Sequence, residues 1–201
     1  MKQIFAVWAE KSVIFTEVCL KMHLSEKTIE KEVVFEGRII TVRKDVAELE
    51  DGTTAPRELV IHSGGVCVVP LTDDNEVIMV RQFRYAFGEP LLEIPAGKLE
   101  IGEEHRSAAL RELEEETGAQ CGSFDYLGVC YPSVAYLTEK IHMYLARDLR
   151  FGKAHTDEGE YLDVLRIPLE EAVQMVMRGE IPDAKTQIAL LKTKMIIDGD
   201  K

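Results

Sequence analysis

The sequence lacks the features of a secreted, membrane-spanning or nucleic-acid-binding protein. Its four cysteines among 201 residues include no C-x-x-C pair and no zinc-ligand spacing, so we expect reduced thiols rather than disulfides or structural zinc. No apolar run reaches the roughly 18 residues that a membrane-spanning helix needs. Positive charge is also scarce, because 24 lysines and arginines against 36 acidic residues give a formal net charge of −12. We therefore expect a cytoplasmic protein that binds neither membranes nor a nucleic-acid backbone.

The length fits one compact domain with a small addition. Apolar residues make up 46% of the chain, which suffices for a packed core. We place an N-terminal extension of unknown role at 1–21, an N-terminal β region at 22–62 and the main domain at 63–201. Charged residues interrupt the extension too often for a signal peptide. It is either an amphipathic strand or helix, or a stretch that precedes a natural start at Met22.

Apolar periodicity and turn residues predict an α/β protein. Three strands are expected in the N-terminal region, with a turn at Asp51 and Gly52: Lys31–Glu36, Arg38–Leu49 and Pro56–Ile61. The strands expected after them are Val66–Leu71, Glu76–Phe83, Leu91–Ile94, Phe124–Tyr131, Glu139–Ala146 and Leu162–Ile167. The expected helices run from Ser107 to Thr117, from Pro168 to Arg178 and from Asp183 to Ile197.

The helix predicted from Ser107 carries three glutamates on one face. Glu112, Glu115 and Glu116 share an arc of about 100° at helical spacing. A solvated acidic face is the ordinary explanation for such a pattern. Here, however, the acids lie near the negative end of the helix, which Gly118 marks and where anions are disfavoured. We therefore expect a cation to neutralise them.

The segment before this helix supplies a further oxygen ligand. Gly97 permits a close approach of the backbone, so that the carbonyl of Ala96 can lie beside the acidic face. Carboxylate and carbonyl oxygens are the ligands that Mg²⁺ or Mn²⁺ prefers, with water and substrate phosphates completing the coordination shell. The sequence thus predicts a metal site formed by Ala96, Glu112, Glu115 and Glu116.

The spacing of these residues resembles the signature of the Nudix hydrolases. The pattern G-x5-E-x7-R-E-[aliphatic]-x-E-E-x-G-[aliphatic] fits at Gly97, Glu103, Arg111, Glu112, Leu113, Glu115, Glu116 and Gly118. Ala119 departs from it, since a larger aliphatic residue is usual there. The resemblance implies an α/β/α sandwich with a mixed sheet, and Mg²⁺-dependent hydrolysis of a diphosphate bond in which Glu112 and Glu116 are catalytic. The signature positions expected to be structural are Gly97, Glu103, Arg111 and Gly118.

Charged residues around the predicted strand Glu76–Phe83 are candidate substrate contacts. Arg81 and Arg84, with nearby aromatic residues, suit a diphosphate and a flat base, although charged residues also protect edge strands. The "QxR" sequence that includes Arg84, just before "LEIPAG", resembles the ADP-ribose branch of the Nudix hydrolases. Glu139 is a third candidate, for the ribose or the metal shell, or else a structural residue at the start of a strand. Glu93 is a further acidic neighbour of the site or an ordinary strand residue.

A polar loop near the predicted strand Leu162–Ile167 carries the candidate general base. Because the helix glutamates are committed to metal, a separate group must take the proton of the attacking water. Glu158 and Glu160 lie in a glycine-containing loop that can move when substrate binds. The ADP-ribose branch takes its base from an acidic loop at this place, and the matching spacing favours Glu158 with Glu160 as its helper. His155 is the alternative base on chemical grounds.

The resemblance predicts a homodimer that hydrolyses ADP-ribose to AMP and ribose 5-phosphate. In the ADP-ribose branch, an N-terminal strand region exchanges between two subunits and helps to build the substrate site. Val134 and Ala135 stand where that branch usually has Pro and Gly, so the alternative substrate is another nucleoside diphosphate sugar, such as GDP-mannose or ADP-glucose. A non-catalytic ligand-binding module is a further alternative, and the intact glutamates speak against it.

Overall fold

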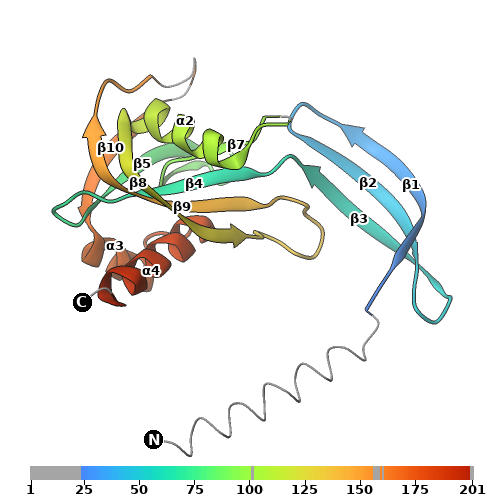
Figure 1. Ribbon diagram of the computed structural model, residues 1–201. Coiled ribbons are helices and arrows are strands. Elements are labelled where there is room, and N and C mark those ends of the chain that lie inside the picture. The colour runs from blue at the N-terminus through green and yellow to red at the C-terminus, as the bar shows by residue number, and fades with distance from the viewer. Residues whose placement is uncertain (1–23, 101, 156–158, 160, 200–201) are drawn as a thin grey trace, which may run out of the picture. The chain divides into compact units, whose positions relative to one another are not determined.

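The computed structural model describes residues 24–100, 102–155, 159 and 161–199 (Figure 1). The expected extension 1–21 lies outside the described residues. Within the described ranges, no helix is both long enough and apolar enough to cross a membrane.

The chain forms two compact units. The smaller one holds the described residues up to Gly37 together with Thr41–Leu59. The larger one holds Arg38–Ile40 and the chain from Val60 onwards.

The N-terminal strands form a three-stranded sheet in the order β1-β2-β3, comprising β1 (Lys27–Glu36), β2 (Ile40–Glu48) and β3 (Thr54–His62). β1 and β2 are antiparallel, as expected, with Lys27 opposite Glu48. The predicted turn is confirmed: Gly52 has a φ of 80°, and the Thr53 amide donates a 3.0 Å hydrogen bond to the carboxylate of Asp51. Every residue of β1 is exposed, including its apolar side chains.

The larger unit contains two further sheets. One has the order β7-β4-β9-β8, and the other has the order β10-β5-β6. Their strands are β4 (Gly65–Pro70), β5 (Glu76–Arg84), β6 (Glu89–Glu93), β7 (Ala96–Lys98), β8 (Ala119–Cys130), β9 (Ile141–Phe151) and β10 (Leu162–Pro168). β4 runs parallel to β9 while β8 runs antiparallel to it, so the four-stranded sheet is mixed, as predicted.

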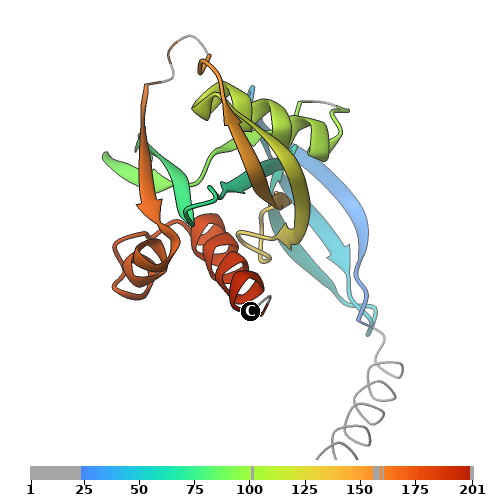
Figure 2. The same cartoon turned by 60° about the vertical axis from the view of Figure 1, so that its left-hand side comes forward.

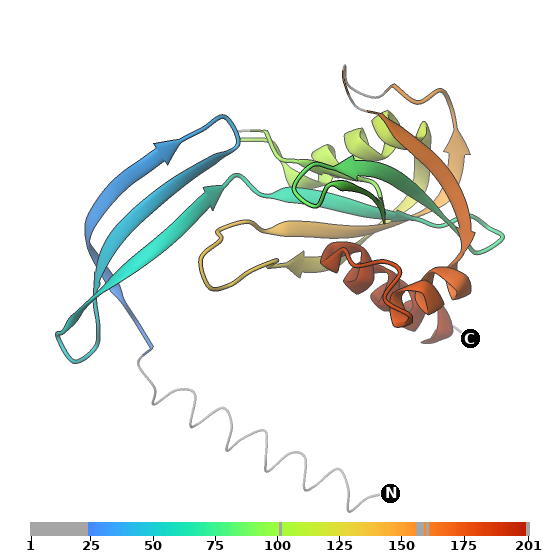
Figure 3. The same ribbon diagram turned by 180° about the vertical axis from the view of Figure 1, so that it is seen from behind.

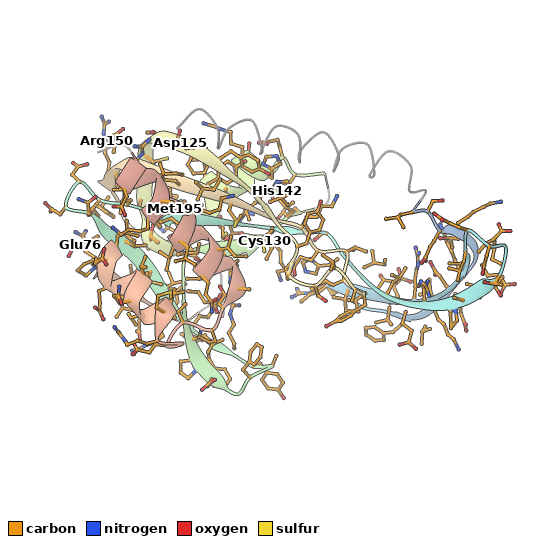
Figure 4. The ribbon with its side chains drawn as sticks, turned by 90° about the horizontal axis from the view of Figure 1, so that it is seen from below. Glu76, Asp125, Cys130, His142, Arg150 and Met195 are labelled. Carbon is orange, nitrogen blue, oxygen red and sulfur yellow. The ribbon has the colours of Figure 1, made fainter. Side chains whose placement is uncertain are left out.

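Helices cover both faces of the mixed sheet. α2 (His105–Thr117) lies on one face, and α3 (Leu169–Met177) and α4 (Ala184–Gly199) lie on the other (Figures 1 and 2). The alternation of side chains along β4 explains the layers. Val66 and Val68 pack with α2, whereas Cys67 and Val69 belong to the core that includes α3 and α4. The α/β/α sandwich predicted from the sequence is therefore confirmed. Seen from below, α3 and α4 lie in front of the strands (Figure 4).

Local capping sets the ends of α2. At its start, the carboxylate of Glu104 accepts hydrogen bonds of 2.9 Å from the amides of Arg106 and Ser107, so the helix begins two residues before the predicted start. At its end, Gly118 adopts a left-handed φ of 68° and its amide donates to the Glu114 carbonyl. The predicted glycine stop is thus confirmed, and the acidic residues lie in the last two turns.

Strands β8 and β9 extend well past one of their predicted ends. The sequence predicts strands at Phe124–Tyr131 and Glu139–Ala146, whereas β8 begins at Ala119 and β9 extends to Phe151. The reason is their mutual pairing, which places Ala119 opposite Phe151. Long-range pairing of this kind stabilises segments whose local sequence is a weak strand signal.

Candidate active site

The acidic residues of α2 share one arginine. Arg111 donates from Nη1 to Glu112 at 2.9 Å and to Glu115 at 2.7 Å, and from Nε to Glu103 at 3.1 Å. The hydrogen bond to Glu103, followed by the charge of Glu112, raises the pKa of Arg111. The same hydrogen bond lowers the pKa of Glu103. Arg111 thus lies inside the acidic cluster and is placed to align its carboxylates. The structural role expected for it and for Glu103 stays a prediction.

Strand β7 passes directly against two glutamates, Glu112 and Glu116, of the acidic ridge of α2, which comprises Glu112, Glu115 and Glu116. The amide of Ala96 donates a 3.1 Å hydrogen bond to the carboxylate of Glu116, which is almost fully buried. A Cβ atom at Gly97 would overlap the carboxylate of Glu112, so a larger residue there would displace this carboxylate. The structure therefore brings Ala96, Gly97, Glu112 and Glu116 together.

The carboxylates of α2 and the neighbouring backbone of β7 bring several oxygen atoms to one place. Within the described part of the chain, no group of three or more His, Cys, Asp or Glu side chains is arranged so that it could by itself hold a metal ion. Mg²⁺ does not need one, because it usually binds one or two carboxylates and keeps several waters and substrate oxygens. Glu112 and Glu115 are half-buried, and Glu116 is buried beside the Ala96 backbone. That these residues bind a metal ion stays a prediction.

Arg84 lies in a second ionic cluster, near the end of β5. Its Nε and Nη2 atoms donate to the two oxygens of Glu93 at 2.5 and 2.6 Å, and Lys185 of α4 donates to the same carboxylate at 2.5 Å. Burial alone would raise the pKa of Glu93, but the hydrogen bond from Arg84 and the charge of Lys185 outweigh it, so this pKa is lowered. Glu93 is therefore an ionised, buried partner of Arg84 rather than an ordinary strand residue.

Arg81 has a different environment from Arg84. The two residues are an odd number of positions apart on β5, so their side chains point to opposite faces of the strand. Arg81 donates to Asp163 of β10 at 2.6 Å, and both side chains are more than half exposed. Its contact with substrate stays a prediction.

Glu139 lies close to the β4–β7 junction. Its carboxylate is 3.4 Å from Nδ1 of His62. A Cβ atom built on Gly65 would lie 3.9 Å from Glu139 Oε1 and 2.9 Å from the carbonyl oxygen of Gly97. Glu139 is thus a neighbour of the strand pair that carries the signature glycine, and its role toward ribose or metal stays a prediction.

The loop expected to carry the base starts beside α2. The amide of His155 donates to the carbonyl of Glu115 at 2.9 Å, and the amide of Gly152 donates to the carbonyl of Gly118 at 2.7 Å. Glu158 and Glu160 themselves lie outside the described residues.

Sequence reasoning missed Lys185 as a site neighbour. A lysine in the first turn of a helix faces the positive end of the helix dipole, which is unfavourable without an anionic partner. A lysine at this position in the sequence is therefore the signal that could have identified Lys185 as part of an ion pair. Its partners are Glu93 and Asp183, whose carboxylates lie 2.5 and 2.9 Å from Nζ.

The Glu93 ion pairs predict a pH-dependent contribution to stability. The folded-state pKa of Glu93 is lowered from 4.5, so its contribution is fully present above that value and is lost as the pH falls through the folded-state pKa. We expect the difference in free energy of unfolding between the wild type and Glu93→Gln to be largest near pH 7 and to shrink below about pH 4.5. Urea unfolding at a series of pH values measures it.

The exposed Glu89→Gln on the same strand is the matched control and should show no such trend. A wild-type advantage over Glu93→Gln that stays constant down to about pH 3 would contradict the ionised assignment of Glu93.

Comparisons with known proteins give the family. A NUDIX domain model matches residues 62–189, and a model for the nucleoside diphosphate sugar hydrolase N-terminal domain matches residues 26–60. The chain is 42% identical over 167 residues to the methanol dehydrogenase activator of Bacillus methanolicus, covering 82% of this chain and 90% of that protein. It is also 42% identical over 169 residues to the ADP-ribose pyrophosphatase of Bacillus subtilis, covering 83% and 91%.

A solved structure agrees with the fold. The crystal structure of an ADP compounds hydrolase superposes with a TM-score of 0.78 at 24% identity, covering 90% of this chain and 98% of that one. The signature residues, the sandwich and the family match therefore agree, and the chain belongs to the Nudix domain family as a Nudix hydrolase.

Proposed function

We propose that this protein hydrolyses the diphosphate bond of ADP-ribose to AMP and ribose 5-phosphate. The observation that carries the proposal is the contact of Glu112 and Glu116 with the Ala96–Gly97 segment, which gathers oxygen ligands at one place. The 42% identical relative named ADP-ribose pyrophosphatase supports the choice of substrate. Arg84, which is 39% exposed, supplies a cation for the diphosphate.

The residues proposed to hold Mg²⁺, with Mn²⁺ as a substitute, are Ala96 through its carbonyl and Glu112, Glu115 and Glu116 through their carboxylates. When bound, the ion neutralises diphosphate charge and lowers the pKa of a water molecule. Arg111 keeps Glu112 and Glu115 aligned, and the Ala96 amide holds Glu116. The ligands are thus oriented before substrate arrives.

Glu158 is proposed as the general base, with Glu160 as its helper. His155 is the alternative base. Its backbone amide donates a hydrogen bond to the carbonyl of Glu115, so this end of the loop lies beside the acidic ridge. Glu158 follows three residues later in the sequence. A carboxylate there can accept the proton of the attacking water.

The substrate is tested by incubating the protein with Mg²⁺ and, separately, ADP-ribose, ADP-glucose and GDP-mannose. We expect AMP and ribose 5-phosphate from ADP-ribose at the highest kcat/KM. Val134 and Ala135, which replace the usual Pro and Gly, favour another nucleotide sugar as the second candidate. A clear preference for ADP-glucose or GDP-mannose would establish that candidate, and no product from any of the three would refute the proposal.

Glu112→Gln should lower kcat by about 100-fold or more, since even the loss of a residue behind a metal ligand costs 10- to 100-fold. The fold should persist, because the substitution keeps the shape of the side chain. Glu114→Gln is the matched control: it lies on the same helix, is exposed and pairs with Gln120. Wild-type turnover in Glu112→Gln would show that this residue does not bind the catalytic metal.

The base assignment predicts unequal effects of two neighbouring substitutions. Glu158→Gln should reduce kcat by about 10²- to 10⁴-fold, the usual contribution of general-base catalysis. Glu160→Gln should reduce it less. Single-turnover rates across a pH series measure both, and a larger loss in Glu160→Gln would exchange the two roles.

We propose that residues 22–62 form the dimerisation region of a cytoplasmic homodimer, with 63–201 as the catalytic domain. The support is β1, where Ile29, Val33 and Phe35 are apolar yet 46%, 56% and 54% exposed. Several large, exposed apolar side chains on one strand favour an interface with another chain.

Sedimentation analysis should give a dimer for the wild type and a monomer for Phe35→Glu, because a charge buried at the interface is costly. Phe151→Glu is the matched control, with a similarly exposed side chain on β9. A dimer that survives Phe35→Glu would place the interface elsewhere.

A further inference from the structure

We infer that Lys185 is a positioning residue, which holds Glu93 and through it sets the place of Arg84 for the substrate diphosphate. The inference rests on the proposed function, in which Arg84 contacts the substrate. It adds a residue from the C-terminal helix, far from the signature sequence, to the machinery of the site.

The first step is the shared carboxylate of Glu93. Lys185 and Arg84 donate to it from two different elements, α4 and β5, and Glu93 itself is 2% exposed. A carboxylate with such strong donors on both sides has one orientation, since rotating it would break a charge-assisted hydrogen bond in a buried place. Lys185 thus fixes the orientation of the Glu93 carboxylate that binds the guanidinium of Arg84.

The second step concerns the donors of Arg84. A guanidinium has five N–H groups, and the bidentate contact with Glu93 uses two of them, on Nε and Nη2. Three N–H groups remain beyond those given to Glu93. The side chain of Arg84 is 39% exposed, whereas that of Lys185 is 11% exposed, so Arg84 faces outward and Lys185 supports it from within.

The third step is the charge balance of the cluster. Arg84 and Lys185 carry two positive charges, and Glu93 and Asp183 carry two negative charges. Without Lys185 the cluster would hold one excess negative charge next to Arg84, the proposed contact of the diphosphate, and Glu93 could turn toward other donors. Both effects weaken the hold on an anionic substrate.

The fourth step is the anchoring of Lys185 itself. Asp183 binds Nζ of Lys185 at 2.9 Å and caps the helix by accepting from the amide of Thr186 at 3.0 Å. The hydroxyl of Thr186 in turn accepts a 3.1 Å hydrogen bond from the amide of Ile94, the residue after Glu93. The start of α4 is therefore fastened to the strand end that carries Glu93 by two adjacent contacts. Figure 3 shows the larger unit from behind, with α3 and α4 below the strands.

The test is steady-state kinetics with ADP-ribose on Lys185→Met. Loss of positioning should raise KM about tenfold and change kcat less than about threefold, since a contact made equally in the ground and transition states changes KM alone. Lys185→Arg, which restores a donor to Glu93, should recover part of the KM. Lys192→Met is the matched control, because it removes an exposed lysine from the same helix and should leave KM unchanged.

Two further variants separate positioning from simple stabilisation. Glu93→Gln should raise KM, and adding Lys185→Met to it should raise KM little more, because both act on Arg84 through one carboxylate. If Lys185→Met alone does not fold, Lys185→Met with Asp183→Asn removes one charge of each sign and should fold with a raised KM.

The inference is overturned if Lys185→Met, or its combination with Asp183→Asn, folds and has a wild-type KM, whatever its stability in urea. Turnover of ADP-ribose by the wild type would still support the proposed function in that case. A wild type that cleaves no nucleotide sugar refutes the proposed function itself. Independent, additive effects of Glu93→Gln and Lys185→Met on KM also overturn the inference.

Discussion

The fold depends on how one short segment, Glu93 to Gly97, is held between two helices. On the α4 side, Glu93 binds Lys185 and the amide of Ile94 binds Thr186. On the α2 side, the amide of Ala96 binds Glu116, and Gly97 leaves space for the carboxylate of Glu112. Successive residues therefore bind helices on opposite faces of the sheet, and a shift of either helix is transmitted to the segment that carries the proposed metal ligand.

This arrangement explains why buried charge is tolerated in the structure. Glu93 and Glu116 are 2% and 3% exposed, and an isolated carboxylate so deeply buried would be very costly. Each instead accepts hydrogen bonds from fixed donors, a lysine and an arginine in one case and a backbone amide in the other. The polar groups of the site are thus parts of the packing, and the catalytic proposal needs no rearrangement of the core.

Local sequence patterns predicted the acidic ridge and its surroundings. The contacts of Lys185 and the full lengths of β8 and β9 depend on residues far apart in the sequence, so local patterns did not predict them. Helical spacing alone places Glu112 and Glu116 on one face, and glycine chemistry alone marks Gly97 and Gly118. Lys185 and Glu93 meet across 92 positions of sequence, so no window of the chain contains both. The lengths of β8 and β9 could not be predicted locally either, because each strand extends as far as its pairing with the other does.

The central claim is that the ridge on α2 binds a divalent cation through oxygen atoms. The most direct measurement is anomalous diffraction from crystals soaked in Mn²⁺. The account predicts a peak beside Glu112 and Glu116, at the distance of about 2 Å that small hard cations keep from oxygen ligands. A catalytically active crystal with Mn²⁺ bound only elsewhere, and none beside this ridge, would contradict the account.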